Sequence, residues 1–396
     1  MITTGVTGGR WRASVNAWGA IEPWDGSPVL DWHVAADDRW HTPAEEPAVR
    51  QKRLGGTAVV ETRLRVPEGD AVHRVYSVAD HGGLTIVEVE NMSALPIAVA
   101  FTRGDLLTVL PPTAPIQGIT LPAGSIAVPV GHKATVTVAL RHNDPAAGTL
   151  PNGLATATGV VRGWTATTER ASRLLLPDAP VGPRVVAARC ELLLNGPAHP
   201  DDDPIAFLIA LGQMVRMGEG AASWIPDVAH ALELAAKGDV RDWRLAAALD
   251  SAEIVLVHAG EQRARRDLAA MRARLAPSTA LSADEPSDPV LFTAWVERRL
   301  CAAGVGGGDL LPAGLPEGWA GTNFEVYGLP TSAESTVSFA VRWHGARPAV
   351  LWEQSGTSVA LGASSLAPDW TTSEPTGETL WPVPPGLAPS DGVSFS

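Results

Sequence analysis

The sequence predicts a mixed, multidomain fold: an N-terminal antiparallel β-sandwich at residues 1–165, a central α-helical hairpin domain at 183–303 and a C-terminal β-sandwich at 309–396. Three observations lead to this prediction. The 396 residues exceed what one ordinary hydrophobic core holds. Apolar residues alternate with polar ones at both ends of the chain, whereas they recur at helical spacing in the middle. The 39 Gly and 33 Pro residues also predict many turns.

Short alternating segments fill the N-terminal part. Residues 58–66 and 71–79 both alternate and are joined by Pro67-Glu68-Gly69-Asp70, and 84–90 follows a second turn. Further segments follow at 97–101, 106–110, 125–130 and 135–140. Regular spacing of this kind is typical of antiparallel sheets that pack as a sandwich.

Helical patterns dominate the middle of the chain. The expected helices are 184–194, 205–217, 226–236, 240–259, 261–275 and 289–303. The acidic run 201–203 followed by Pro204 is a helix start, because carboxylates cap the free N–H groups and proline needs no partner there. Residues 205–211 are continuously apolar, so their helix must be covered on most sides. Residues 304–308, GVGGG, are expected to be a linker.

A β-hairpin is the clearest signal in the C-terminal part. Val337, Phe339, Val341 and Trp343 alternate with polar or small residues, residues 345–348 interrupt the run, and a second strand follows at 349–353. We expect Trp343 and Trp352 to lie in the core of this domain. Other strands are expected at 323–327, at 358–361 and around Trp381.

Composition and motifs exclude several classes of function. The net charge of −13 argues against nucleic-acid and anionic membrane partners. No apolar run approaches a membrane span or the core of a signal peptide, so we expect a cytoplasmic protein. The phosphate-loop, dinucleotide, zinc-protease and serine-hydrolase motifs are absent, so we expect no cofactor. Nothing fixes a metal geometry around His33, Asp37 and His41, so we expect no metal.

Two stretches combine carboxylates with indole rings. Residues 31–41 hold three carboxylates, two imidazoles and two indoles, and residues 316–325 form the second stretch. Glycoside hydrolysis needs two carboxyl groups about 5–10 Å apart, and aromatic faces can stack on sugar rings. The candidate catalytic residues are Asp37, Asp38 and Glu317, and the candidate substrate-binding residues are Trp32, Trp40, His41, Trp319 and Asn323. The alternative is that both stretches are polar loops that their tryptophans anchor.

The order of sheet, helices and sheet, with an N-terminal part rich in Trp and Asp, resembles the six-hairpin (α/α) glycosidases. The resemblance implies a carbohydrate-active protein, similar to glycoside hydrolases, that hydrolyses or binds a saccharide. The chain departs from the family in one respect, because a complete barrel needs about twelve helices and 183–303 supplies about six. The alternative function is therefore a non-catalytic binding or scaffolding protein. The sequence leaves open whether the protein is an enzyme, and it leaves open the oligomeric state.

Overall fold

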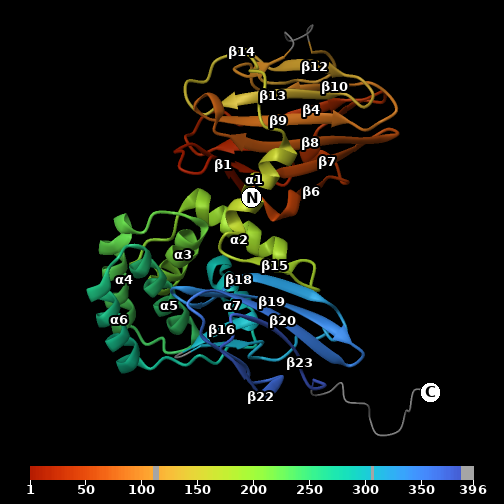
Figure 1. Ribbon diagram of the computed structural model, residues 1–396. Helices are drawn as coiled ribbons and strands as arrows, with labels where there is room; N and C mark the ends of the chain where they lie inside the picture. Colours follow the sequence, from red (N-terminus) through yellow and green to blue (C-terminus); the bar gives the residue numbers. More distant parts are fainter. Residues whose placement is uncertain (110–115, 305–306, 385–396) are drawn as a thin grey trace, which may run out of the picture. The chain divides into compact units, whose positions relative to one another are not determined.

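The structure is a computed structural model that describes residues 1–109, 116–304 and 307–384 (Figure 1). Within these residues the chain forms five mostly antiparallel sheets and, chiefly in its middle part, seven α-helices. The chain divides into two compact units, Met1–Ala166 and Thr167–Ser396. The predicted mixed, multidomain arrangement is confirmed at this level, whereas the packing of sheets as sandwiches stays a prediction.

The described part of the first unit contains three sheets. The first has the order β1 (Ile2–Gly5), β2 (Arg12–Val15) and β3 (Ile21–Pro23). The second has the order β12 (Ile126–Val130), β10 (Ile97–Phe101), β4 (Trp32–Ala35) and β5 (Trp40–His41). The third has the order β14 (Gly148–Thr149), β11 (Leu107–Thr108), β13 (Thr135–Arg141), β9 (Leu84–Asn91), β8 (Gly69–Val78), β7 (Val60–Val66) and β6 (Arg50–Arg53). Strand β6, with the sequence RQKR, ends this largest sheet.

The seven-stranded sheet is buried on both faces. Val75 and Val87 point into a core that also holds side chains of the two smaller sheets. Their neighbours Tyr76 and Ile86 point into a second core on the opposite face, as the two-residue period of a strand requires. Helix α1 (Ala157–Thr168), which is not among the helices predicted from the sequence, contributes to this second core.

Six helices follow in the second unit. They are α2 (Val181–Asn195), α3 (Pro204–Met217), α4 (Ile225–Lys237), α5 (Trp243–His258), α6 (Gln262–Leu275) and α7 (Pro289–Leu300). The predicted start of α3 is confirmed, because the Asp203 carboxylate accepts hydrogen bonds from the backbone N–H groups of Ile205 and Ala206. Helix α3 is buried from residue 205 to residue 215 and packs against α2, α4, α5 and α7. Short 3-10 helices are η1 (Pro43–Glu45), η2 (Leu54–Gly56), η3 (Asp80–Gly82) and η4 (Ala222–Trp224).

Two sheets complete the described part of the second unit. One has the order β15 (Arg173–Leu175), β18 (Phe324–Ser332), β19 (Ser335–His344), β20 (Arg347–Gly356) and β23 (Thr376–Leu380). The other has the order β16 (Cys301–Gly304), β17 (Gly307–Leu310), β21 (Ala360–Ala363) and β22 (Ala367–Thr372). Strand β22 is not among the strands predicted from the sequence.

The predicted linker at 304–308 is wrong for Gly304, Gly307 and Gly308, which belong to strands, while residues 305 and 306 lie outside the described residues. Strands β16 and β17 pair with each other from Cys301 opposite Leu310 to Gly304 opposite Gly307. Glycine is required at Gly307, because a Cβ atom there would overlap the carbonyl oxygen of Ala360 on β21. Strand β16 begins at the residue after the end of α7. The second unit therefore contains both the helices expected as a domain at 183–303 and the sheets expected as a domain at 309–396.

The predicted hairpin is confirmed as β19 and β20. The pairing of His344 with Arg347 leaves a two-residue turn, shorter than the expected four residues, and Gly345 supplies its positive φ of 62°. Phe339 lies opposite Trp352, whose side chain is buried. Trp343 is half-buried at the end of the strand, where its indole N–H donates to the carbonyl of Thr322.

Replacing Trp352 tests the core of the five-stranded sheet. Its ring packs edge-to-face on Trp370, with ring centroids 5.3 Å apart, and Trp370 packs in the same way on Trp381. Trp352→Ala should lower the free energy of unfolding by about 3–5 kcal/mol, because it leaves a cavity in a packed cluster. The measurement is urea denaturation followed by circular dichroism. The control is Leu351→Ala on the opposite face, where the side chain is 41% exposed and the loss should be small. Equal losses for the two variants would contradict this assignment of the faces.

Candidate functional site

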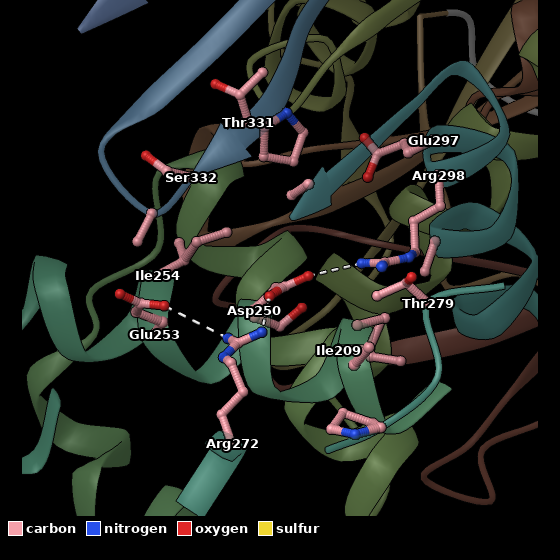
Figure 2. A pocket seen from close by; sticks show the side chains of 18 of the residues that line it. Ile209, Asp250, Glu253, Ile254, Arg272, Thr279, Glu297, Arg298, Thr331 and Ser332 are labelled. Carbon is pink, nitrogen blue, oxygen red and sulfur yellow. Dashed lines mark hydrogen bonds and ion pairs between the residues drawn. The ribbon is translucent and has the colours of Figure 1, made fainter. Parts of the chain in front are cut away.

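The second unit contains a partly open cavity of about 700 Å³. It lies among α3, α5, α6, α7, β16 and β18 (Figure 2). Small side chains leave this space open. The alanines of the wall are Ala246, Ala247, Ala269, Ala273, Ala276, Ala294, Ala303 and Ala333. Charged residues from all four of these helices complete the wall.

Asp250 is the centre of the first charged group. It lies on α5, and its two carboxylate oxygens accept hydrogen bonds from different helices. Arg298 of α7 donates from Nη1 to Oδ2 at 2.7 Å, and Arg272 of α6 donates from Nη1 to Oδ1 at 2.5 Å. Figure 2 shows the two arginines approaching Asp250 from opposite sides. Arg272 also lies 3.5 Å from Glu253, one helical turn after Asp250.

Glu297 is the centre of the second charged group. It lies on α7 and is 4% exposed. Its Oε1 accepts hydrogen bonds from Arg189 Nη2 at 2.6 Å and from Ser172 Oγ at 2.7 Å. Its Oε2 accepts hydrogen bonds from Arg216 Nη1 at 2.7 Å and from Gln213 Nε2 at 2.9 Å. Arg216 also donates from Nη2 to Oε1, so its guanidinium forms a bidentate pair with the carboxylate.

The electrostatics of the Glu297 group hold its carboxylate ionised. Burial alone would raise the pKa of Glu297, but the charges of Arg216 and Arg189 and their hydrogen bonds lower that pKa to about 2. Burial lowers the pKa of Arg189 to about 10, which leaves the guanidinium charged at neutral pH. Burial also raises the pKa of the Cys301 thiol in the cavity wall to about 12. Cys301 is therefore a neutral thiol and a poor nucleophile at neutral pH.

Two side chains of the cavity wall carry buried polar atoms that have no hydrogen-bond partner in the described part of the chain. Arg298 uses Nη1 for Asp250, while its Nε and Nη2 atoms are buried and form no hydrogen bond. The Thr331 Oγ1 atom on β18 is buried and forms none either. Arg298 is 6% exposed and Thr331 is 2% exposed. Buried polar groups normally have partners, so these three atoms are exceptions among the described residues.

The first predicted cluster lies in the first unit, around the turn between β4 and β5. Asp37 and Asp38 are exposed in this turn. His41 is buried, with Nε2 3.0 Å from Asp38 Oδ1 and Nδ1 3.0 Å from Glu46 Oε1. The hydrogen bond with His41 lowers the pKa of Asp38. Trp40 is half-buried and donates its indole N–H to the carbonyl of Gln117.

Trp32 belongs to the core of the first unit. It is 1% exposed, its ring stacks on His73 at 4.5 Å, and its indole N–H donates to the carbonyl of Trp18. The ring therefore presents no open face on which a sugar could stack.

The second predicted cluster lies in the second unit, in the loop between β17 and β18. Glu317 is exposed, whereas Trp319 is buried and packs edge-to-face on Phe324. Asn323 is exposed, and its Oδ1 accepts a hydrogen bond from the backbone N–H of Trp343. Asp37 and Asp38 belong to one unit and Glu317 to the other, so their convergence in one cleft stays a prediction.

The charged residues of the cavity are not among the candidates predicted from the sequence. Arg189, Asp250 and Glu297 each stand in an apolar helical segment, as in AARCELLL, AAALDSAEIVL and AWVERRL. A charged residue on an otherwise apolar helix needs a buried partner, so the sequence pattern alone could have identified these three residues as candidates. Their partners could not be identified, because Arg189 and Glu297 lie 108 residues apart in the chain.

Searches for metal sites, membrane spans and relatives give no lead to a reaction. No group of three or more His, Cys, Asp or Glu residues within the described ranges could hold a metal ion. In the same ranges no helix combines the length and the apolar character that crossing a membrane requires. Comparison with protein-family models, with curated proteins and with solved structures finds no match.

Replacing Glu297 tests its role in stability. Glu297→Gln keeps the shape of the side chain but leaves Arg189 and Arg216 without their counter-charge. We expect a loss of about 3–5 kcal/mol in the free energy of unfolding, as for other broken buried ion pairs. The control is Glu285→Gln, which removes an exposed pair with Arg184 and should cost less than about 1 kcal/mol. A loss at Glu297 no larger than at Glu285 would show that the buried network does not stabilise the fold.

The stability should also depend on pH through Glu297. Its pKa is about 2 in the folded protein and 4.5 ordinarily. Because the folded value is the lower one, this contribution is fully present above pH 4.5 and is lost as the pH falls toward 2. Full protonation of Glu297 therefore lowers the free energy of unfolding by about 3 kcal/mol. Urea denaturation between pH 6 and pH 3 should therefore show a steeper loss of stability for the unmodified protein than for Glu297→Gln. Parallel pH profiles would contradict the assignment.

Proposed function

We propose that the protein binds a small molecule in the cavity of its second unit and does not hydrolyse a glycosidic bond there. The observation that carries this proposal is a cavity of about 700 Å³ in which all three carboxylates of the wall are engaged by arginines. Cavities of about 300–1,000 Å³ with an apolar wall and few polar groups are typical of ligand sites. The alanine-rich wall fits this description.

Glycoside hydrolysis places a demand on carboxyl groups that the cavity does not meet. One carboxyl group must hold a proton at neutral pH, so its pKa has to be raised. The pKa of Glu297 is lowered instead, and Asp250 and Glu253 are occupied by hydrogen bonds from Arg272. These carboxylates position arginines in the wall.

A saccharide ligand is the second candidate, at a different place. It is supported by the indole rings on the first unit, where Trp24 is 56% exposed and Trp18 is 40% exposed. Exposed indoles supply flat apolar faces for sugar rings. The lowered pKa of Asp38 favours binding over acid catalysis in this unit, because Asp38 stays ionised at neutral pH. Saccharides should then raise the melting temperature of the protein unless Trp24 is replaced by Ala.

A blocked cavity tests the first candidate. Ala269 and Ala270 are neighbouring exposed residues of α6, and of the two only Ala269 lines the cavity. Ala269→Trp should place an indole ring in part of the cavity, while Ala270→Trp adds the same ring outside it. A thermal-shift screen of sugars, organic acids, amines and amides should find compounds that stabilise the unmodified protein and Ala270→Trp but not Ala269→Trp, because a ligand stabilises only the state that binds it. The proposal is wrong if no compound stabilises the protein, or if Ala269→Trp responds like its control.

A further inference from the structure

Resting on the proposed binding function, we infer that the ligand of the cavity is an uncharged and largely apolar molecule. The inference deepens the proposed function by naming the chemical class of the ligand. Three properties of the wall lead to it: its charges balance, its charged side chains are paired with one another, and most of the remaining wall is apolar.

The charged side chains that line the cavity carry no net charge. They are three arginines and three carboxylates, namely Arg216, Arg272, Arg298, Asp250, Glu253 and Glu297. Among the described residues no lysine or histidine lines the cavity, and the thiol of Cys301 is neutral because burial raises its pKa to about 12. The wall therefore has no excess charge that a charged ligand would neutralise.

Each of these charged side chains also has an oppositely charged partner within the wall. The pairs are Arg216 with Glu297, Arg272 with Asp250 and Glu253, and Arg298 with Asp250. Their nitrogen–oxygen distances lie between 2.5 and 3.5 Å. A charged ligand would either displace one of these partners or stay unpaired in the cavity, and both cost free energy. An uncharged ligand leaves the pairs intact.

Most of the other side chains in the wall are apolar. They are the alanines named above together with Ile209, Ile254, Pro277 and Pro330. Burial of an apolar ligand surface against them supplies affinity and needs no polar partner. Ser251 and Thr279 also line the cavity. Their hydroxyl groups both donate and accept hydrogen bonds, which suits a neutral polar group such as a hydroxyl on the ligand.

The experiment compares molecules that share a ring and differ in charge. One series is naphthylmethanol, naphthoate and naphthylmethylammonium, and the other is cyclohexylmethanol, cyclohexanecarboxylate and cyclohexylmethylammonium. Binding to the full chain at neutral pH is measured by isothermal titration calorimetry and by thermal shift. We expect each alcohol to bind at least about tenfold more tightly than either charged member of its series, because only a charged member breaks an ion pair or stays unpaired.

Two variants give the wall a net charge and should change the preference in opposite directions. Asp250→Asn removes one negative charge, so naphthoate should bind at least about tenfold more tightly than to the unmodified protein. Arg272→Gln removes one positive charge, so naphthylmethylammonium should gain by a similar factor. The double variant restores the balance and should again bind the alcohol most tightly. Each single variant tests the inference if the other does not fold.

The matched control is Glu233→Gln. Glu233 forms an exposed ion pair with Lys237 on α4 and does not line the cavity, so this variant changes the charge of the protein by the same amount outside the wall. The order of binding within each series should stay as in the unmodified protein. A gain for naphthoate as large as in Asp250→Asn would show that the net charge of the chain determines the preference, and it would overturn the inference.

The outcomes separate this inference from the proposed function. If a charged member binds as tightly as its alcohol, and Ala269→Trp abolishes that binding, the cavity is a ligand site but the inference is overturned. If Asp250→Asn and Arg272→Gln keep the preference of the unmodified protein, the paired charges do not determine it and the inference is overturned. If no alcohol binds up to its solubility limit, the inference also fails. If the alcohols bind equally well to Ala269→Trp, the inference and the proposed function both fail.

Discussion

The buried carboxylate of Glu297 is the interaction on which the second unit depends most. It ties α7 to α2 through Arg189, to α3 through Arg216 and to the segment before β15 through Ser172. Removing such charges from water is costly, and the cost is recovered only when every lone pair is engaged. Four hydrogen-bonding side chains satisfy this condition around Glu297. The carboxylate therefore fixes the spacing of the helices with a directional contact that apolar packing does not provide.

This directional contact also explains how the cavity stays open. Alanine side chains on adjacent helices would normally allow close approach, and the space would collapse. Here Glu297 and Arg216 belong to the cavity wall, and Asp250 of α5 binds Arg298 of α7 and Arg272 of α6, so the three helices are linked through side chains of fixed length. The spacing is set by the lengths of charged side chains, while the alanines leave the space between them. A cavity built in this way has a preformed shape, which lowers the entropic cost of binding.

Local features of the fold were predictable from the sequence, and features that depend on distant partners were not. The alternation around Phe339 and the cap at Asp203 are local, so the hairpin and the start of α3 were predicted correctly. The glycines at 304–308 indicated a linker, but β21 follows more than fifty residues later and pairs with this segment. The same limit applies to the site. A local cluster of polar and aromatic residues such as 31–41 is visible in the sequence, whereas Asp250 and Arg298 become neighbours only through the packing of α5 and α7.

The last strand of the seven-stranded sheet has a consequence for the behaviour of the protein in a crowded solution. Strand β6 pairs with β7 through Arg50 to Arg53, and the sheet order ends there. An edge strand offers unpaired backbone groups to which a second copy of the same chain could add its own strand. Arg50, Lys52 and Arg53 oppose such an addition, because a second copy of this edge would bring the same positive charges into register. The four residues of β6 therefore oppose aggregation in which the edge strands of two copies pair with each other.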